Sequence, residues 1–388
     1  MSPSAATPLQ ADLRAQFPML ATSTYLVSHS MGAAPLAAKA ALETYWDEWA
    51  AEGPEAWEAW LPRIAEIADG IGAIVGAPAG SVFLGPNVSA FQAAIATCLD
   101  FSGERNEVVY EALQFPSVTY VWKEWERYGV RVRVVPSDDG RTIPTERIVA
   151  AITEKTAIAV LSHAYYVSGA VADIRTIQTH CHSVGALLCV DAYQTTGVYP
   201  YDVTEWDLDL VTGGSHKWLC GGPGCGFLYV KPSLLERFRP AVTGWMAHEN
   251  PFAFEDAPIE HARSMYRFGT GTPTIPGYVV AKPGHDFIRA AGVENIRAHS
   301  VRMTTKIAEM ALERGLRVNS PLQPERRAGW IGIDFDDSED VCRKLVAQRV
   351  FLDYRPGCGL RVSAHIYTSA DEIDAFFSML DRLRTLRS

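Results

Sequence analysis

A lysine and an acid near the middle of the chain are the residues best suited to covalent chemistry. Lys217 stands in TGGSHKWLCGGPG, among glycines and hydroxyl residues, and Asp191 ends the apolar run ALLCV. Trp218 and Leu219 follow the lysine, so we expect its amine to be partly desolvated. Desolvation lowers the pKa of a lysine and makes its amine a better nucleophile. An acid at the end of a buried strand can hold a proton on a ring nitrogen nearby.

Pyridoxal 5'-phosphate (PLP) is a cofactor that such a pair suits. The lysine amine forms a Schiff base with its aldehyde, and the acid keeps the pyridine nitrogen protonated, so that the ring accepts electrons. The glycines around Lys217 let the backbone approach a flat ligand closely. The alternative is a surface lysine in an ordinary glycine-rich turn, which the lysine alone would favour. Asp191 upstream, at a predicted strand end, favours the PLP site.

Two segments carry a family resemblance. DAYQ, at Asp191, and SHKW, at Lys217, resemble the D-x-x-Q/H and H-K segments of the class V aminotransferase group of PLP-dependent transferases. That group includes cysteine desulfurases, isopenicillin-N-epimerase-like proteins and kynureninases. The resemblance implies that Lys217 carries PLP, with Asp191 on the pyridine nitrogen and Gln194 beside the phenolic oxygen of the ring. His216, just before the lysine, is expected to be catalytic with Lys217 and Asp191.

The order of predicted elements points to the fold. Strands and helices alternate up to the ALLCVD strand, which predicts a parallel βαβ sheet, and GCGFLYV should be antiparallel because no helix precedes it. The resemblance implies the α/β fold of the fold-type-I PLP-dependent transferases, with a mostly parallel, seven-stranded central sheet and a smaller α+β C-terminal domain. We expect an N-terminal arm over residues 1–20, a large PLP-binding domain over 21–285 and the small domain over 286–388. The N-terminal segment should pack near that small domain.

Further cofactor contacts follow from the resemblance. Val88 and Ser89 open a predicted helix after a polar turn, where free N–H groups suit a phosphate. Ser215 offers another donor to the phosphate. Phe115, in QFPS, matches a position that stacks on the pyridine ring, although a core phenylalanine before a helix is the alternative.

Two kynureninase-like segments lie further along the chain. Trp245, in GWMAH, matches the G-W-W-G-H segment of kynureninases and is expected near the cofactor. Thr272, in GTGTP, matches a threonine that reaches the phosphate from the partner subunit. The resemblance therefore implies a homodimer whose active site is shared between subunits.

Three residues are expected to bind the substrate, a small amino acid. His29 and Ser30 lie in HSMG, which resembles the substrate-facing G-N-S-L-G loop of kynureninases; a loop histidine bonded to backbone is the alternative for His29. Arg361 matches the arginine that forks the substrate α-carboxylate at the end of the family pattern. The alternative for Arg361 is a surface ion pair.

Composition bounds the remaining possibilities. The chain has 388 residues, 48% of them apolar, and a net charge of −10 without a Lys/Arg-rich block, so we expect a large core and no nucleic-acid partner. Seven irregularly spaced cysteines without a C-x-x-C predict reduced thiols in a cytoplasmic protein and no metal site. We expect neither a signal peptide nor a membrane span. Four tryptophans, Trp46, Trp49, Trp57 and Trp60, are predicted to pack on amphipathic helices.

The reaction favoured by the resemblance is a kynureninase-like hydrolytic cleavage of a Cβ–Cγ bond. His216 and Gln194, however, stand where kynureninases usually carry tyrosine and histidine. At these two positions the chain resembles desulfurases and epimerase-like proteins more than kynureninases. A Cβ–S lyase or cysteine desulfurase, an aminotransferase and an epimerase therefore stay open. Cys358 lies too close to Arg361 to match the desulfurase nucleophile. The alternative outside catalysis is an inactive binding protein on the same fold.

Overall fold

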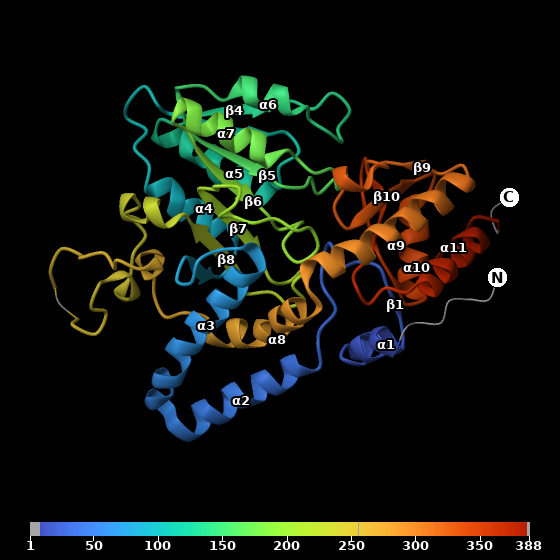
Figure 1. Cartoon of the computed structure of the whole chain (residues 1–388), viewed down its shortest axis with the longest axis horizontal. Coiled ribbons are helices and arrows are strands. Elements are labelled where there is room, and N and C mark those ends of the chain that lie inside the picture. The colour runs from blue at the N-terminus through green and yellow to red at the C-terminus, as the bar shows by residue number, and fades with distance from the viewer. Residues whose placement is uncertain (1–7, 255, 386–388) are drawn as a thin grey trace.

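A seven-stranded sheet forms the centre of the larger part of the protein (Figure 1). The computed structural model describes residues 8–254 and 256–385. In spatial order the strands are β2 (Val82–Gly85), β8 (Gly226–Val230), β7 (Leu210–Gly214), β6 (Leu187–Asp191), β5 (Thr156–Ser162), β3 (Glu107–Glu111) and β4 (Arg131–Val135). Strands β3 to β7 are parallel, whereas β8 is antiparallel to both neighbours. The predicted sheet and its antiparallel GCGFLYV strand are confirmed.

Helices connect most of the parallel strands. These are α4 (Val88–Thr97), α5 (Pro116–Glu124), α6 (Thr145–Ala151) and α7 (Ile174–Val184). Capping residues determine where two of these helices begin. The side chains of Asn87 and Asp173 accept hydrogen bonds from backbone N–H groups three residues further along, in α4 and α7 respectively. The carboxyl ends of β3, β5, β6 and β7 consequently lie at one edge of the sheet, where ligands bind in folds of this kind.

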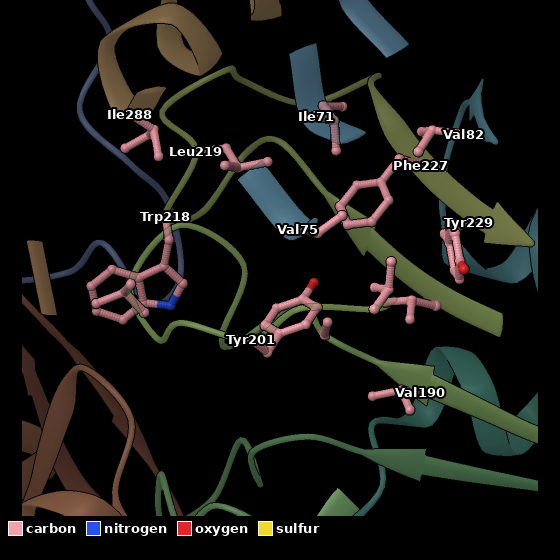
Figure 2. Packing of buried hydrophobic residues seen from close by; sticks show 14 of the residues in the cluster. Ile71, Val75, Val82, Val190, Tyr201, Trp218, Leu219, Phe227, Tyr229 and Ile288 are labelled. Atoms are coloured by element: carbon pink, nitrogen blue, oxygen red, sulfur yellow. The ribbon is translucent and has the colours of Figure 1, made fainter. Parts of the chain in front are cut away.

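The core under the sheet is built with two long helices, α3 (Trp57–Val75) and α8 (Ile275–Ala291). Figure 2 shows Ile71 and Val75 of α3 beside Phe227 of β8, with Trp218 and Leu219 in the same cluster. All five side chains are fully buried. Burial of a side chain of this size stabilises the fold by roughly 1.5–3 kcal/mol. The segment that carries Lys217 is therefore anchored by the two residues that follow the lysine.

A smaller antiparallel sheet lies in the C-terminal part. Its strands are β12 (Asp353–Arg355), β13 (Gly359–Ser363), β10 (Trp330–Asp334) and β9 (Arg317–Val318). Helices α9 (Val293–Glu313), α10 (Ser338–Ala347) and α11 (Ala370–Thr385) pack beside it and against one another (Figure 1). This α+β arrangement agrees with the expected fold class. The boundary expected at residue 285 falls inside α8 and stays a prediction.

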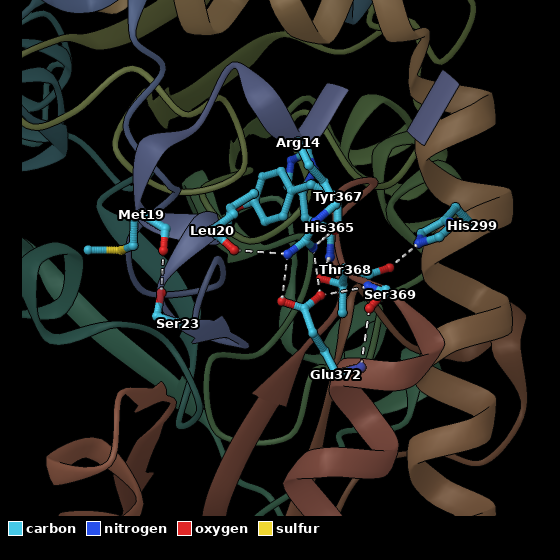
Figure 3. Close-up of polar contacts among 10 residues, drawn as sticks. All are labelled: Arg14, Met19, Leu20, Ser23, His299, His365, Tyr367, Thr368, Ser369 and Glu372. Atoms are coloured by element: carbon cyan, nitrogen blue, oxygen red, sulfur yellow. Dashed lines mark hydrogen bonds and ion pairs between the residues drawn. The ribbon is translucent and has the colours of Figure 1, made fainter. Parts of the chain in front are cut away.

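The N-terminal segment is attached to the C-terminal part. Strand β1 (Thr24–Tyr25) pairs in parallel with β11 (Val350–Phe351). Arg14, on α1 (Pro8–Ala15), donates from Nη1 to Glu372 Oε2 at 2.7 Å and from Nη2 to the Leu20 carbonyl at 3.1 Å (Figure 3). This attachment matters for the site, because the loop that follows β1 carries His29 and Ser30.

The prediction for the tryptophans is wrong for two of the four. Trp60 is buried and Trp57 half-buried, but Trp46 and Trp49, on α2 (Ala37–Glu52), are 60% and 52% exposed. Helix α2 lies against α8 at the margin of the molecule, and none of its residues, all of which the structure describes, is buried. Amphipathic spacing alone does not reveal that one face of a helix lacks a partner within its own chain. Within residues 8–254 and 256–385, no helix is long and apolar enough to span a lipid bilayer.

Candidate active site

A cavity of about 260 Å³ opens at the carboxyl edge of the large sheet. Ser162 at the end of β5, Asp191 at the end of β6 and Lys217 after β7 contribute to its wall. The strand register places Ser162 opposite Asp191 and Asp191 opposite Thr212. The acid and the lysine that the sequence singles out therefore share one cavity, built by neighbouring strands.

Lys217 is held in surroundings that favour its neutral amine. Burial lowers its pKa to about 8, the Arg361 charge acts in the same direction, and Asp191 opposes both. The Nζ atom lies 5.5 Å from the ring centre of Phe115 and 5.1 Å from that of Tyr193. A lysine with such a pKa supplies a useful fraction of free amine near neutral pH.

Asp191 is a buried carboxyl group with one backbone donor. Its Oδ1 accepts from the Tyr193 N–H at 3.0 Å, and burial raises its pKa while Lys217 opposes that shift. A carboxylate in such surroundings gains most from a cationic N–H group placed against it. This is what the protonated nitrogen of a pyridine ring would provide.

Aromatic groups narrow the cavity around the lysine amine. Phe115 is 40% exposed and meets Tyr166 edge to face, with ring centres 5.3 Å apart. The Tyr193 ring occupies space that Gly214 leaves free, since a Cβ atom at Gly214 would lie 2.3 Å from the ring. Burial lowers the pKa of His216 to about 4, so this residue is neutral at physiological pH, and its ring centre lies 5.5 Å from that of Tyr193.

The N-terminus of α4 also opens on the cavity. Asn87 and Val88 are part of the wall, and the Asn87 side chain accepts from the Ala90 N–H at 3.1 Å. The first N–H groups of a helix have no partner within the helix, and the helix dipole is positive there. The turn thus suits a phosphate at the end of the cavity beside Lys217.

The loop after β1 brings the expected substrate residues to the cavity. His29 and Ser30 line it, and the Gln194 Nε2 atom donates to the His29 carbonyl at 3.2 Å. Gly32 donates to the His216 carbonyl at 2.8 Å and lies so close to the lysine segment that a Cβ atom there would be 2.2 Å from the Lys217 carbonyl oxygen. The loop is therefore packed directly on the backbone that carries Lys217.

Arg361 reaches the cavity from β13 as part of a charged cluster. Its Nε donates to Asp353 Oδ1 at 2.8 Å, its Nη2 bonds Asp353 Oδ2, and its Nη1 donates to the Tyr166 carbonyl at 2.9 Å. The His29 ring bonds the same Asp353 Oδ1 at 2.9 Å, and burial lowers the His29 pKa to about 4. Hydrogen bonds to His29 and to the Arg361 guanidinium group hold the pKa of Asp353 well below its usual range, against the effect of burial.

Four of the expected cofactor residues lie outside the cavity wall in the described chain. The Ser89 hydroxyl donates to the Ser117 carbonyl at 3.0 Å, and the Ser215 hydroxyl bonds the His285 ring at 2.8 Å. Trp245 packs on Trp57 and Phe252, with ring centres 6.3 and 5.5 Å away. Thr272 is exposed and lines a separate hollow of the same chain.

Three residues in or beside the cavity were not predicted from the sequence. Tyr193 lies inside DAYQ and contacts the lysine amine, Asp353 holds Arg361, and Arg355 lines the cavity. Tyr193 carried a usable signal, because it stands between two residues expected at the site. The other two carried a weaker one, their place in the DYRP segment just before Arg361.

The residues present fit PLP. Lys217 supplies an amine of lowered pKa, Asp191 a buried carboxyl group, and the start of α4 a phosphate cradle. The Gln194 Oε1 atom is buried without a hydrogen-bond partner, although its Nε2 atom is bonded. A free buried acceptor is costly in a closed protein, and a polar ligand bound in the cavity would satisfy it. These four features converge on one cavity of a size suited to a small planar molecule.

Comparison with known proteins places the chain in a family. The family model for aminotransferase class-V matches residues 62–376. An uncharacterized aminotransferase of Bacillus subtilis strain 168, YcbU, is 30% identical over 360 residues, covering 93% of this chain and 94% of that protein. A kynureninase of Bacillus anthracis is 26% identical over 385 residues, covering 93% and 88% of the two chains.

Solved structures agree on the fold. A cysteine desulfurase from Thermococcus onnurineus NA1 superposes with a TM-score of 0.85 at 18% identity, covering 98% of this chain and 99% of the other. The cystine C–S lyase C-DES, in complex with cysteine persulfide, gives 0.86 at 20% identity, covering 94% and 99%. With the family match over most of its length and a cavity that fits the cofactor, this chain belongs to the class-V aminotransferase family of PLP-dependent enzymes.

Proposed function

We propose that this enzyme hydrolyses the Cβ–Cγ bond of a small amino acid with a γ-carbonyl group and releases alanine. The observation that carries the proposal is the shared cavity of Lys217, Asp191 and Arg361, in a chain similar to kynureninases over 93% of its length. The HSMG segment, whose resemblance to a kynureninase loop suggested that activity, contributes His29 and Ser30 to the same wall, and QFPS contributes Phe115.

In this proposal each side chain of the cavity has a role that follows from its position. PLP, when bound, supplies the electron sink that any reaction at Cα or Cβ needs. Lys217, with a pKa of about 8, takes the proton from Cα. Arg361 binds the α-carboxylate with the N–H groups that Asp353 and Tyr166 leave free. Phe115 covers the cavity beside Lys217 and excludes water from one face.

A cysteine-desulfurase activity finds less support. Cys220, Cys225 and Cys358 are buried, and burial raises the pKa of each thiol to about 12. No cysteine is among the described residues that line the cavity. A nucleophilic thiol needs exposure and a lowered pKa. The similarity to a desulfurase and to a C–S lyase is a similarity of fold. Elimination, transamination and epimerisation are alternative results of the product analysis described below.

The assembly is part of the same proposal. A homodimer with a shared site would bring Thr272 of one subunit to the phosphate of the other, which accounts for its position away from the cavity of its own chain. A cytoplasmic location also belongs to this proposal, since all seven cysteines are free thiols.

Product analysis tests the reaction. Purified protein, loaded with PLP, is incubated with L-kynurenine and 3-hydroxykynurenine, and amino acids and keto acids are quantified. We expect alanine, and none from Lys217→Ala. Pyruvate, a keto acid of the substrate or inverted stereochemistry would instead establish a lyase, an aminotransferase or an epimerase. If the protein stays colourless when PLP is added, the interpretation as an enzyme is wrong and the chain is a binding protein.

A further inference from the structure

The cavity contains more positive charge than one α-carboxylate requires. Lys217, Arg355 and Arg361 are in its wall, together with one acid, Asp191. The start of α4 would hold the phosphate of PLP. The lysine is committed to the cofactor and Asp191 to the ring nitrogen, so two guanidinium groups remain for the substrate.

Asp353 does not neutralise both arginines. Its Oδ1 accepts from Arg361 Nε at 2.8 Å and bonds His29 at 2.9 Å, and its Oδ2 bonds Arg361 Nη2. Arg355 Nη2 lies 3.4 Å from the same Oδ2 atom, beyond a good charged hydrogen bond. The Asp353 carboxylate thus contacts three groups, and its contact with Arg355 is the longest of them.

Arg355 keeps donors available at the cavity. Its Nη1 atom uses one N–H group on the Tyr354 carbonyl, at 2.9 Å, so donors remain on the rest of the guanidinium group. The Arg355 side chain is 46% exposed, whereas that of Arg361 is 4% exposed. Its charge nevertheless acts on the site, since it contributes to the lowering of the Lys217 pKa. Arg355 is therefore a partly solvated cation at the mouth of the cavity.

The hairpin between β12 and β13 fixes this placement. Arg361 pairs directly with Asp353, and Arg355 pairs with Gly359 where the hairpin turns. Asp353 and Arg355 are two positions apart on a strand, so their side chains leave the same face. Gly359 has a φ of +84°, and a Cβ atom there would lie 2.3 Å from the Ile333 carbonyl oxygen. The turn is therefore closely packed against β10 and sets the two arginines at a fixed separation.

We propose that Arg355 binds an anionic group at the far end of the substrate side chain, so that the enzyme prefers amino acids with an acidic side chain. The inference rests on the proposed function only in that the same cavity binds the amino acid through Arg361. Arg361 lies deep in the wall and Arg355 at the mouth, which matches an α-carboxylate held inside and a second anion held outside.

Matched ligands test this assignment without turnover. L-glutamate and L-glutamine, and L-aspartate and L-asparagine, have the same size and differ in one charge. Their dissociation constants are measured by calorimetry on the PLP-loaded enzyme and on Arg355→Gln and Arg355→Lys variants. Arg343→Gln, on the exposed face of α10, is the control for loss of a surface charge. L-alanine reports on the α-carboxylate alone.

The wild-type enzyme should bind the acid of at least one pair about tenfold more tightly than its amide, as a charged hydrogen bond at a half-exposed site predicts. Arg355→Gln should remove this preference by weakening only the acid, Arg355→Lys should keep part of it, and Arg343→Gln should keep all of it. Equal binding of acid and amide by the wild type would overturn the proposal. Equal weakening of acid, amide and alanine in Arg355→Gln would also overturn it, because Arg355 would then contact the α-carboxylate. Failure to form alanine from a γ-keto substrate contradicts the proposed reaction and leaves this preference intact.

Discussion

At the scale of single residues, burial and charge act on Lys217 in opposite directions. Burial disfavours the ammonium form, Asp191 stabilises it, and burial has the larger effect, so the pKa falls to about 8 from an ordinary value of 10.5. Asp191 experiences the reverse, because burial raises its pKa and the lysine lowers it. Each group thus stabilises the charged form of the other, against the effect of burial.

The lysine should show this in the pH dependence of cofactor attachment. Only the neutral amine reacts, and a lowered pKa means that it becomes abundant at lower pH than in a free lysine. From pH 7 to pH 9 the neutral fraction rises from about one tenth to about nine tenths. We expect the rate of covalent PLP attachment to the cofactor-free protein to rise by nearly tenfold over this range and to level off above it, as followed by visible absorbance. A rate that still rises steeply at pH 10 would contradict the lowered pKa, and Lys217→Ala should attach none.

How far the sequence predicts the site depends on the separation of the residues involved. Asp191 and Lys217 could be predicted because each stands beside its own strand, and sheet topology brings strand ends together. Tyr193 was within reach for the same reason. The bond between His29 and Asp353 joins residues 324 positions apart, and no local pattern encodes it. Arg361 was expected at the substrate, but its carboxylate partner became visible only in the folded chain.

At the scale of elements, the loop after β1 is positioned by a close backbone contact. Gly32 donates to the His216 carbonyl, and the space where its Cβ would stand is filled by the Lys217 carbonyl oxygen. The loop that carries His29 is therefore coupled by close backbone packing to the segment that carries Lys217. This coupling explains why the predicted HSMG loop contains a glycine at that position.

Replacing this glycine should disturb both segments. In Gly32→Ala the new methyl group would overlap the Lys217 carbonyl oxygen, so we expect the free energy of unfolding to fall by about 1–3 kcal/mol, as for other overpacked sites. Affinity for amino acids should fall too, because His29 and Ser30 are displaced. Gly103→Ala is the matched control, since nothing lies within 4 Å of the added group. Denaturant unfolding of the two variants gives the comparison, and equal stabilities would show that the loop adapts freely.

Secondary structure was the more predictable part of the fold. Strands β3 to β6 alternate with helices α5, α6 and α7 along the chain, and this alternation is what predicted a parallel βαβ sheet. The exposure of Trp46 and Trp49 did not follow, because it depends on what surrounds α2 and not on α2 itself. Sequence patterns describe a face, whereas exposure depends on the neighbour of that face.

At the scale of the whole molecule, several apolar groups face outwards away from the cavity. Trp46 and Trp49 on α2 are more than half exposed, as are Phe252 and Phe254 near Trp245. Thr272 is exposed as well and lies outside the cavity of its own chain. These positions are compatible with the shared homodimeric site inferred from the resemblance, in which each subunit would complete the phosphate contacts of the other.

Mixed dimers test that arrangement. Thr272→Asp would place a negative charge against the partner's phosphate, so Thr272→Asp homodimers should not retain PLP, and Lys217→Ala homodimers cannot attach it covalently. In a heterodimer of the two variants, a shared site predicts one pocket with both defects and one with an intact lysine and an intact threonine. We therefore expect one covalently attached PLP per heterodimer, measured by absorbance after reduction, with differently tagged subunits separated by affinity. If Thr272 served its own subunit, both pockets would be defective and the heterodimer would attach none; if Thr272→Asp homodimers kept PLP, the residue would not contact the phosphate at all.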